Sequence, residues 1–443
     1  MGKLLNKKPE LVVALDIGTT KVVAIAGMRN DLGQIEVLGY GRVKSEGVLR
    51  GVVANIDKTV KAISDAVDMA EKRAKYEFQV VHVGIAGQHI RSLHHRGILT
   101  RDDAQAEIRQ HEIEQMISEM YKLALPPGDQ ILHVIPQEFV VDEEEGIKDP
   151  VGMSGARVEG NFHVITGKMA AANNIMRCIQ RARLKVSEMI LEPIGSASSV
   201  LSKEEMEAGV ALVDIGGGTS DITIFQDGII RHTAVIPFGG NVITKDIKEG
   251  CSVMHDQAEK LKTRFGSALA SEIVDNRIIT IPGIKGREAK EISEKNLAKI
   301  IQARMEEIFD YILFEIRRTG YERKLIAGLV LTGGGSLLKN IEYLAQYHTG
   351  FSARIGWPNE NLKDKKDKEL SSPIYATSIG LLIHGIEHLD IDGGEIVKHE
   401  DELEEAEGNE GDEQNQERFF GRFVNKLFEG TREFFETKED IEF

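Results

Sequence analysis

Short apolar runs alternate with amphipathic stretches along most of the chain. The segments 11–20 and 210–219 resemble each other, because each is an apolar run that leads into Asp-Ile-Gly and then into small hydroxyl residues. The runs that follow them predict further strands, at residues 21–27, 35–44, 220–226 and 229–236. The pattern therefore predicts two related halves.

Apolar residues with a 3.6-residue period predict helices after these strands. One predicted helix carries Ile56, Val60, Ile63 and Val67 on one face. A longer one ends near Gly320. Its apolar face consists of Ile301, Met305, Ile308, Ile312 and Ile316. A mixture of strands and helices in this order is typical of an α/β protein.

Two inserted stretches separate these elements. The first has predicted strands near residues 80–85 and 131–141 and a helix near 104–123, and the second is more helical. The sequence predicts a first half over residues 10–200 with an inserted subdomain at 83–165, and a second half over 201–388 with an inserted subdomain at 237–298.

The composition changes near the carboxy terminus. Residues 398–417 hold ten Asp or Glu and one Lys, so residues 389–417 are expected to form an acidic disordered linker. Residues 418–437 then predict an amphipathic helix that can lie in a membrane surface. The candidate membrane residues are Phe419, Phe420, Arg422, Phe423, Lys426, Leu427 and Phe428. Docking of this helix on the folded body, or on a partner protein, remains an alternative.

Charge and composition narrow the function classes. The chain has 443 residues and a formal net charge of −16, which opposes general binding to nucleic acid. Cys178 and Cys251 stand apart with no nearby ligand set, so no disulfide framework or zinc site is expected and a reducing compartment fits. No apolar run is long enough to predict a transmembrane helix.

The two Asp-Ile-Gly turns carry candidate chemistry. Asp16 and Asp214 each end a predicted strand, and glycines and threonines follow, where backbone N–H groups can approach an anion closely. Two such turns that face each other would hold the phosphates of a nucleotide, with magnesium bound through its waters by the two aspartates. A plain strand-to-strand turn is the alternative for either one alone.

A third glycine cluster lies between a predicted strand at 326–331 and a predicted helix at 337–347. Its residues Gly333, Gly334, Gly335 and Ser336 would let an adenine ring pack against the backbone. A glycine-rich turn before a helix is the alternative interpretation. The sequence contains no GxxxxGK[ST] motif.

Taken together, the three turns resemble the actin, sugar-kinase and heat-shock-chaperone ATPase superfamily in order and spacing, across roughly residues 10–385. Within it, the chain resembles the FtsA family of bacterial cell-division proteins. The motifs that carry this resemblance are the segments 45–51, 133–139, 149–157, 163–167 and 236–240. The resemblance implies a duplicated actin-like ATPase fold with an inserted small α/β subdomain and a carboxy-terminal amphipathic helix.

The resemblance also implies roles for individual residues, with ATP and magnesium as cofactors. Asp16 and Asp214 would orient magnesium, Glu259 and Lys262 would contact ribose and base, and Gly333 to Ser336 would stack on the base. The expected phosphate-binding residues are Gly18, Thr19, Thr20, Lys21, Gly216, Gly217, Gly218 and Thr219. An exposed ion pair is the alternative for Glu259 and Lys262.

Glu192 is the candidate catalytic residue, because a carboxylate at that place in the superfamily can position the attacking water. Its place before Pro193 fits a helix amino terminus equally well, so at most weak ATPase activity is expected.

The family resemblance implies a scaffold that self-associates, tethers the tubulin-like protein FtsZ to the cytoplasmic face of the inner membrane and recruits later division proteins, with no nucleic-acid partner. A cytosolic actin-fold kinase or chaperone ATPase is the alternative. A chaperone would need a substrate-binding domain after residue 385, where this chain has only the linker and the short helix. A pilus-assembly scaffold on the same fold would lack the first insert.

Overall fold

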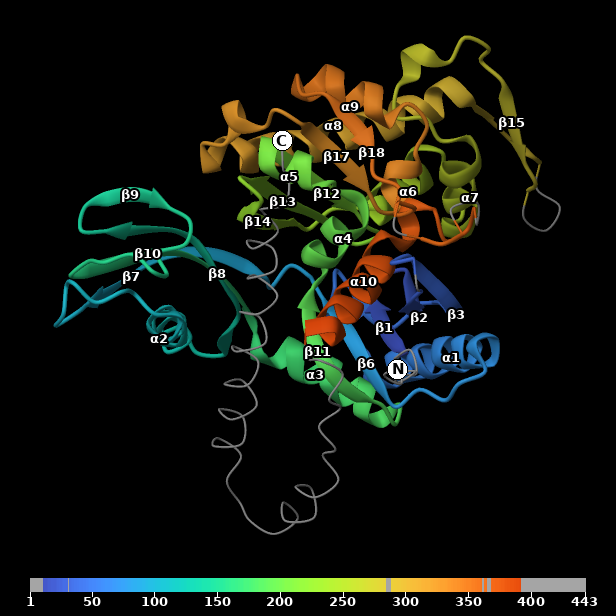
Figure 1. Cartoon of the computed structure of the whole chain (residues 1–443). Helices are drawn as coiled ribbons and strands as arrows, with labels where there is room; N and C mark the ends of the chain where they lie inside the picture. The colour runs from blue at the N-terminus through green and yellow to red at the C-terminus, as the bar shows by residue number, and fades with distance from the viewer. Residues whose placement is uncertain (1–10, 31, 284–287, 361, 365–367, 392–443) are drawn as a thin grey trace.

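The computed structural model describes residues 11–391 apart from 31, 284–287, 361 and 365–367. Two five-stranded sheets occupy the centre of the molecule, and a separate four-stranded sheet projects to one side (Figure 1). Helices pack around these sheets, so the protein is a mixed α/β structure, as the sequence predicts. The predicted acidic linker and amphipathic helix lie outside the described residues.

The first central sheet is a meander extended by two parallel strands. Strands β1, β2 and β3 pair antiparallel, and β6 and then β11 add parallel to the other edge of β1. In spatial order the strands are β11 (Lys185–Leu191), β6 (Val80–Ile85), β1 (Val12–Ile17), β2 (Lys21–Arg29) and β3 (Ile35–Lys44).

The second central sheet repeats this arrangement. Its three antiparallel strands are again consecutive, and its parallel strands again add beside the first of them. In the matching order the strands are β18 (Ala353–Ile355), β17 (Gly328–Thr332), β12 (Val210–Ile215), β13 (Ser220–Gln226) and β14 (Ile229–Ile236). The predicted duplication is therefore confirmed in sheet topology.

Helices cover both faces of the first sheet because its strands are apolar on both sides. Val13 and Leu15 of β1 face one cluster with α1 and α3, whereas Val12 and Ala14 face a second cluster with α10. The helices of the two halves are α1 (Ile56–Ala74), α3 (Met169–Arg181), α4 (Glu192–Val200), α5 (Lys203–Ala208), α8 (Glu294–Thr319), α9 (Ile341–Thr349) and α10 (Ala376–Ile391).

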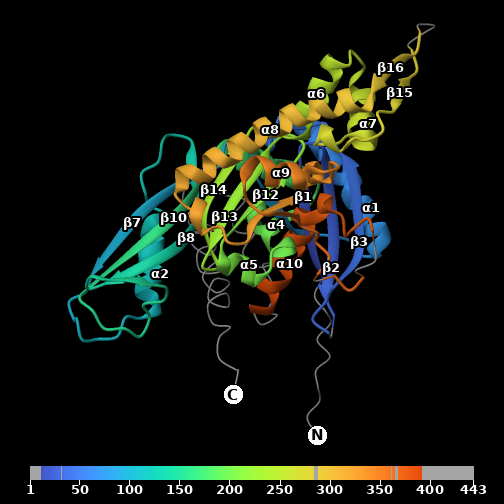
Figure 2. The same ribbon diagram turned by 90° about the horizontal axis from the view of Figure 1, so that it is seen from above.

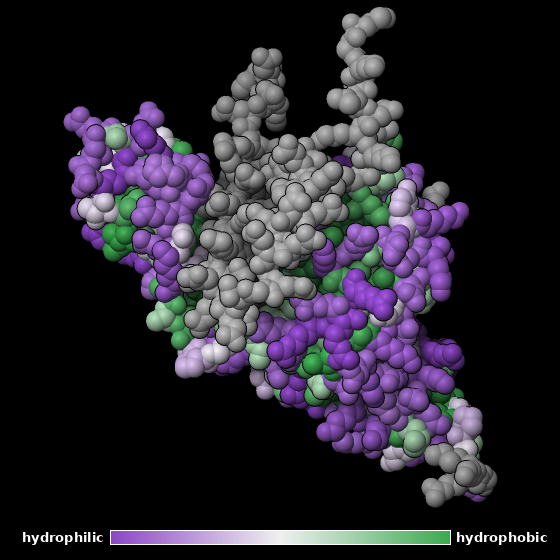
Figure 3. All heavy atoms as spheres, turned by 90° about the horizontal axis from the view of Figure 1, so that it is seen from below, coloured by the Kyte–Doolittle hydropathy of each residue, from purple (hydrophilic) through white to green (hydrophobic). Residues whose placement is uncertain are grey.

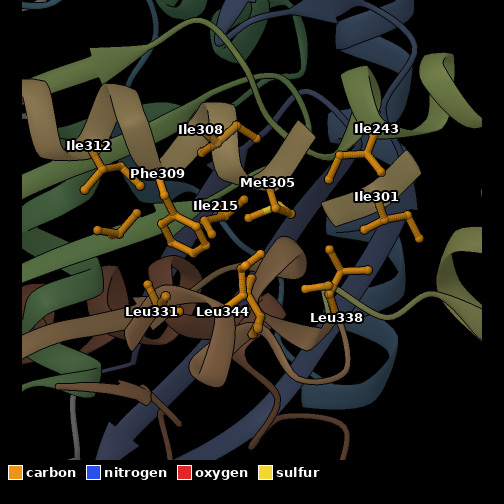
Figure 4. Packing of buried hydrophobic residues seen from close by; sticks show 14 of the residues in the cluster. Ile215, Ile243, Ile301, Met305, Ile308, Phe309, Ile312, Leu331, Leu338 and Leu344 are labelled. Atoms are coloured by element: carbon orange, nitrogen blue, oxygen red, sulfur yellow. The ribbon is translucent and has the colours of Figure 1, made fainter. Parts of the chain in front are cut away.

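Helix α8 forms the core of the second half. Ser293 caps its amino terminus, since the Ser293 hydroxyl accepts from the Asn296 N–H. Gly320, in the left-handed conformation, caps its carboxy terminus, where the sequence predicts the end. Its apolar face, with Met305 and Phe309 fully buried, packs toward β12 and β17 and toward Leu344 of α9 (Figure 4).

The first insert is an antiparallel sheet with one helix on it. Helix α2 (Gln110–Met120) packs its apolar face on the sheet, with Phe139 and Phe162 in the shared core. In spatial order the strands are β7 (Arg91–Thr100), β10 (Arg157–Lys168), β8 (Asp129–Val141) and β9 (Glu144–Ile147). Gln137 ties this sheet to the second half, since its side-chain amide donates to the Ile230 carbonyl oxygen at 2.9 Å.

The second insert lies at the opposite end of the molecule from the four-stranded sheet (Figure 2). It contains α6 (Gly240–Gly250), α7 (His255–Phe265) and a hairpin of β15 (Ile278–Ile281) and β16 (Lys290–Ser293). The sequence indicated its helices but not this hairpin. In the view of Figure 3 the described surface is mainly hydrophilic, with apolar residues in small separate groups.

Three expected elements differ from the structure. The strand at residues 80–85 is β6, which pairs with β1 in a central sheet and not within the first insert. The helix expected at 104–123 is shorter, Gln110–Met120, because Arg101 binds the Ala106 and Glu107 carbonyl oxygens and holds the preceding segment outside the helix.

The helix expected at 337–347 begins later, at Ile341. Residues Gly334–Leu337 form one turn of 3-10 helix instead, and Asn340 is left-handed at φ 61°. Among the described residues, no helix is both long and apolar enough to cross a membrane.

Candidate functional site

The two Asp-Ile-Gly turns have the same backbone geometry. In the first, the Gly18 N–H donates to the Lys21 carbonyl oxygen at 3.0 Å, and in the second the Gly216 N–H donates to the Thr219 carbonyl oxygen at 2.9 Å. Each turn therefore closes a tight hairpin at the same place in its sheet, directly after the aspartate-bearing strand. The repeat seen in the sequence is also a repeat in three dimensions.

The tips of the two turns lie against each other. A Cβ atom built on Gly217 would lie 2.2 Å from Thr20 Cγ2, and one on Gly218 would lie 2.7 Å from Thr19 Oγ1. Only glycine allows this approach. Thr19 Oγ1 also accepts from the Gly51 N–H at 3.1 Å, which holds the first turn in place. The structure thus brings together the residues predicted to bind phosphate.

Two adjacent residues of α10 reach the two aspartates. Ser378 Oγ donates to Asp16 Oδ2 at 2.8 Å, and Thr377 Oγ1 donates to Asp214 Oδ2 at 3.1 Å. Ser196 of α4 adds a third hydroxyl, 3.0 Å from Asp214 Oδ2. Hydrogen bonds of this kind stabilise buried carboxylates and fix their orientation.

The site concentrates negative charge. Lys21 Nζ lies 3.0 Å from Asp16 Oδ2 and is the cation in this group of side chains. Burial, followed by the charges of Asp16, Asp221 and Asp214, raises the pKa of Glu192 well above its ordinary value. Burial and Asp214 raise the pKa of Asp221 to about 8, and burial raises the pKa of Asp214 as well.

A divalent cation would relieve this repulsion, so the charge of the group fits magnesium. The carboxylate oxygens of the group are too far apart for three of them to coordinate one ion directly. In the part of the chain that the structure describes, the one set of three acidic or histidine side chains whose ligand atoms lie within 4.8 Å of one another is elsewhere, at Glu188, His384 and His388. Asp16 and Asp214 therefore suit an ion that keeps its own waters, as magnesium does.

The third glycine cluster follows β17, which pairs parallel with β12, so it lies beside Asp214. A Cβ atom on Gly333 would lie 2.2 Å from Asp214 Oδ1, and one on Gly335 would lie 2.2 Å from Ile215 Cγ2. Gly334 has more space, because a Cβ atom built on it would lie no closer than 3.9 Å to another side chain, that of Ile374. Close packing on β12 thus explains two of these glycines, and Gly334 is the one that leaves room for a flat ring.

Ser336 is fully buried, and its hydroxyl donates to the Gly333 carbonyl oxygen at 2.8 Å. Its side chain therefore stabilises the turn from inside.

Glu259 and Lys262 lie on α7 and form the expected ion pair, with 2.8 Å between Glu259 Oε2 and Lys262 Nζ. The pair is not a fully exposed one, because the Lys262 side chain is only 12% exposed. Lys262 Nζ also donates to the Gly240 carbonyl oxygen at 2.9 Å, and the Gly240 N–H donates to the Gly216 carbonyl oxygen at 2.9 Å. The pair is thus connected through Gly240 to the second turn.

A cavity of about 320 Å³ borders the first turn. It is lined by Thr20, Lys21, Tyr40, Arg42, Val43, Lys44, Met69, Arg73 and Glu369. These residues come mostly from β2, β3 and α1, so the cavity borders the first turn and not the space between the two turns.

Sequence reasoning assigned no role to Ser196, Thr377, Ser378 or Asp221. Asp221 follows two residues after Thr219 of the second turn, so its closeness to that turn is visible in the sequence. The hydroxyl residues give a weaker signal, a run of small residues at 376–380, because their contacts with Asp16 and Asp214 join segments far apart in the sequence.

Comparisons with known proteins decide the family. The family model described as "Cell division protein FtsA" matches residues 211–380. The model described as "SHS2 domain inserted in FTSA" matches residues 87–166, which include the four-stranded sheet except the last two residues of β10. The cell division protein FtsA of Pseudomonas aeruginosa is 41% identical over 378 residues, which cover 85% of this chain and 90% of the relative. This chain belongs to the FtsA family.

Other members of the FtsA family agree. The Escherichia coli K12 protein is 36% identical over 387 residues, which cover 85% of this chain and 91% of the relative. The Bacillus subtilis protein is 34% identical over 388 residues and covers 87% of this chain and 86% of the relative. The predicted family resemblance is confirmed.

Solved structures show the same fold at low sequence identity. The PilM-PilN type IV pilus biogenesis complex contains a chain with a TM-score of 0.62 and 14% identity, and the match covers 85% of this chain and 98% of that chain. The two sheets of identical topology and the family membership together confirm the actin-like fold of this FtsA-family protein.

Proposed function

We propose that this protein binds ATP between its two halves and acts as a self-associating scaffold of cell division. In this role it tethers FtsZ to the cytoplasmic face of the inner membrane and recruits later division proteins. The observation that carries the nucleotide part is the meeting of the two glycine turns, with Thr20 beside Gly217 and an aspartate behind each turn. Family membership supports the division role.

The proposed nucleotide site uses the residues that surround these turns. Backbone N–H groups of the two turns would bind the phosphates, and Lys21 would add a positive charge. Gly334 would border the base, and the Glu259–Lys262 pair would lie near the sugar and base. Magnesium, when bound, would neutralise phosphate charge, and Asp16 and Asp214 would hold it through water.

Weak hydrolysis fits the same site. Glu192 lies near the carboxylates of Asp16 and Asp214, and burial together with these charges raises its pKa well above the ordinary value. Surroundings that raise the pKa disfavour the ionised carboxylate, which is the form that would accept a proton from water. We therefore propose that Glu192 orients the attacking water, with low turnover, and that binding rather than hydrolysis is the main role of the nucleotide.

Self-association would explain how a weak anchor suffices. One amphipathic helix gives only marginal and reversible membrane binding, whereas several linked in one polymer bind much more tightly. Residues 418–437 supply this helix in the proposal, at the end of the acidic stretch. Filament formation with ATP would then gather enough helices to hold FtsZ at the membrane.

The nucleotide site is tested by titration calorimetry of the full-length protein with magnesium-ATP. Asp214→Asn should lower the affinity by at least about tenfold, because the charge that holds magnesium is lost. Asp227→Asn is the matched control, because Asp227 follows the far end of β13 from Asp214, where its carboxylate accepts from Arg231 and from the Gln226 side-chain amide. Equal affinities in the two variants would refute the site.

The tether is tested by sedimentation with vesicles of anionic lipid. Full-length protein should pellet with the vesicles, more so with magnesium-ATP, and should carry purified FtsZ into the pellet. A chain that ends at Glu417 should leave both proteins in the supernatant. If the full-length protein fails to pellet, the tether is refuted and the helix is a protein-docking element. That result would favour the alternative function, a cytosolic actin-fold kinase or chaperone ATPase.

A further inference from the structure

Four histidines and one glutamate gather at the far end of α10 from the nucleotide site. Glu188 lies on β11, His82 on β6 and His133 on β8, and His384 and His388 lie on α10. In Figure 1 this end of α10 lies beside β11 and β6. The chain has 13 histidines in all, so this small region holds an unusual share of them.

Three of these side chains have the spacing of a metal ligand set. One ligand atom from each of Glu188, His384 and His388 lies within 4.8 Å of the others. His384 Nε2 is 3.6 Å from Glu188 Oε1. Ligands bound at about 2.0–2.1 Å in a tetrahedron lie about 3.3 Å apart, so only a small inward movement is needed.

The helix presents both of its histidines to this point. His384 and His388 are four residues apart and so lie on the same face of α10. Their ring centroids are 4.2 Å apart. Two imidazoles at this spacing on one helix, with a carboxylate from another element, form a donor set that suits zinc and neighbouring divalent transition metals better than magnesium.

A further histidine supports the carboxylate. His82 Nδ1 lies 3.7 Å from Glu188 Oε2, the oxygen that does not face His384. Gly385 allows α10 to come this close, because a Cβ atom there would lie 3.0 Å from the His82 ring. A group that holds the second oxygen of a ligating carboxylate orients it toward the metal.

The local charge also suits a cation. Glu188 is 9% exposed, and both of its carboxylate oxygens face histidine rings, Oε1 that of His384 and Oε2 that of His82. One negative charge among imidazoles is a common setting for a divalent transition metal.

We propose that Glu188, His384 and His388 form a binding site for a divalent transition metal of the zinc class, with His82 as the residue that positions Glu188. The three ligands leave a fourth position for water. Such a metal would join β11 to the end of α10, the helix whose other end supplies Thr377 and Ser378 to the aspartates. The site is separate from the magnesium site proposed above.

The test is a titration of chelator-treated full-length protein with zinc chloride, followed by calorimetry, and with cobalt chloride, followed by visible absorption. Wild-type protein should bind one equivalent of zinc and show the absorption bands of tetrahedral cobalt. Zinc should also raise its melting temperature. Magnesium chloride at the same concentration should neither bind at this site nor raise the melting temperature.

His388→Gln should lower the zinc affinity by at least about tenfold and abolish the thermal shift. His95→Gln is the matched control, because His95 is exposed on β7 in the first insert, and it should bind zinc as the wild type does. Glu188→Gln, which keeps the size of the side chain, should resemble His388→Gln. Absence of saturable zinc binding, or unchanged affinity in both ligand variants with folding verified by circular dichroism, would overturn the proposal.

Discussion

Gly380 of α10 lies directly against Gly195 of α4. A Cβ atom built on Gly380 would come within 1.6 Å of the Gly195 carbonyl oxygen, far inside any possible contact. The backbones of the two helices therefore touch at this crossing. Close to it, Ser196, which follows Gly195, and Thr377, one turn before Gly380, hydrogen-bond to each other at 3.0 Å and to Asp214. The closeness of the crossing positions the hydroxyl groups of the site.

We predict that Gly380→Ala destabilises the protein by at least about 3 kcal/mol, because the helices must separate to admit the methyl group. This result opposes helix propensity, by which alanine at a helix interior should stabilise. Urea unfolding followed by circular dichroism measures the change. Gly33→Ala serves for comparison, since Gly33 has φ +75° and open space around it and should cost only about 1 kcal/mol of backbone strain. If both variants lose the same free energy of unfolding, the crossing of α4 and α10 adjusts to the added methyl group.

Loss of the hydroxyl of Ser378 should weaken the site without unfolding the protein. Ser378→Ala removes a hydrogen bond to buried Asp16 and should lower the free energy of unfolding by about 1.5 kcal/mol. Ser198→Ala is the matched control, because Ser198 Oγ donates within its own helix, to the Ile194 carbonyl oxygen. Its loss should change stability by less than about 0.5 kcal/mol. Thermal unfolding of both variants separates the two cases.

The stability of the nucleotide-free protein should fall as the pH rises through neutrality. Burial and Asp214 raise the folded pKa of Asp221 to about 8, against 3.8 as the ordinary value, so between these limits the folded chain holds a proton that the unfolded chain has lost. The resulting stability is complete below pH 4 and is lost as the pH rises toward 8.

Asp221→Asn removes this titration. We expect the variant to be more stable than the wild type by about 2 kcal/mol at pH 8 and to depend less on pH. Urea midpoints between pH 5.5 and 8.5, without nucleotide or divalent cation, measure the difference. A parallel pH dependence in the two proteins would show that Asp221 is ionised in the folded state.

The guanidinium of Arg101 holds the entry to α2 in the first insert. It donates to the Ala106 carbonyl oxygen at 2.8 Å and the Gly155 carbonyl oxygen at 2.9 Å, and Nε lies 2.8 Å from Glu112 Oε1, while its side chain is 7% exposed. Lysine cannot reproduce this fork, so Arg101→Lys should cost about 2–4 kcal/mol.

Hydrogen exchange should locate this loss, with faster exchange in the segment 102–112 and little change in β12 or β13. Arg157→Lys is the matched control, since Arg157 is 55% exposed and its partner Glu159 also pairs with Arg96. It should change stability by less than about 0.5 kcal/mol. Slow exchange in the segment 102–112 of Arg101→Lys would show that the other contacts of the segment suffice.

How much of the structure the sequence predicts depends on how far apart in the chain the interacting residues lie. The face of α8 and its end at Gly320 follow from periodicity and capping, which act within a few residues. The expected helix at 104–123 fails for the opposite reason. Arg101 binds the Ala106 and Glu107 carbonyl oxygens and also the distant Gly155 carbonyl oxygen, and this arrangement leaves no periodic signal.

The candidate site divides in the same way. The sequence by itself determined both aspartate turns, the duplicated strands around them and the family, because these depend on local motifs and their order. Only the tertiary structure decided that Thr377 and Ser378 reach the two aspartates, that Lys262 supports the second turn through Gly240, and that Glu188 meets His384. Those relationships arise where helices and strands distant in the chain pack together, and packing is set by the shape of the whole core.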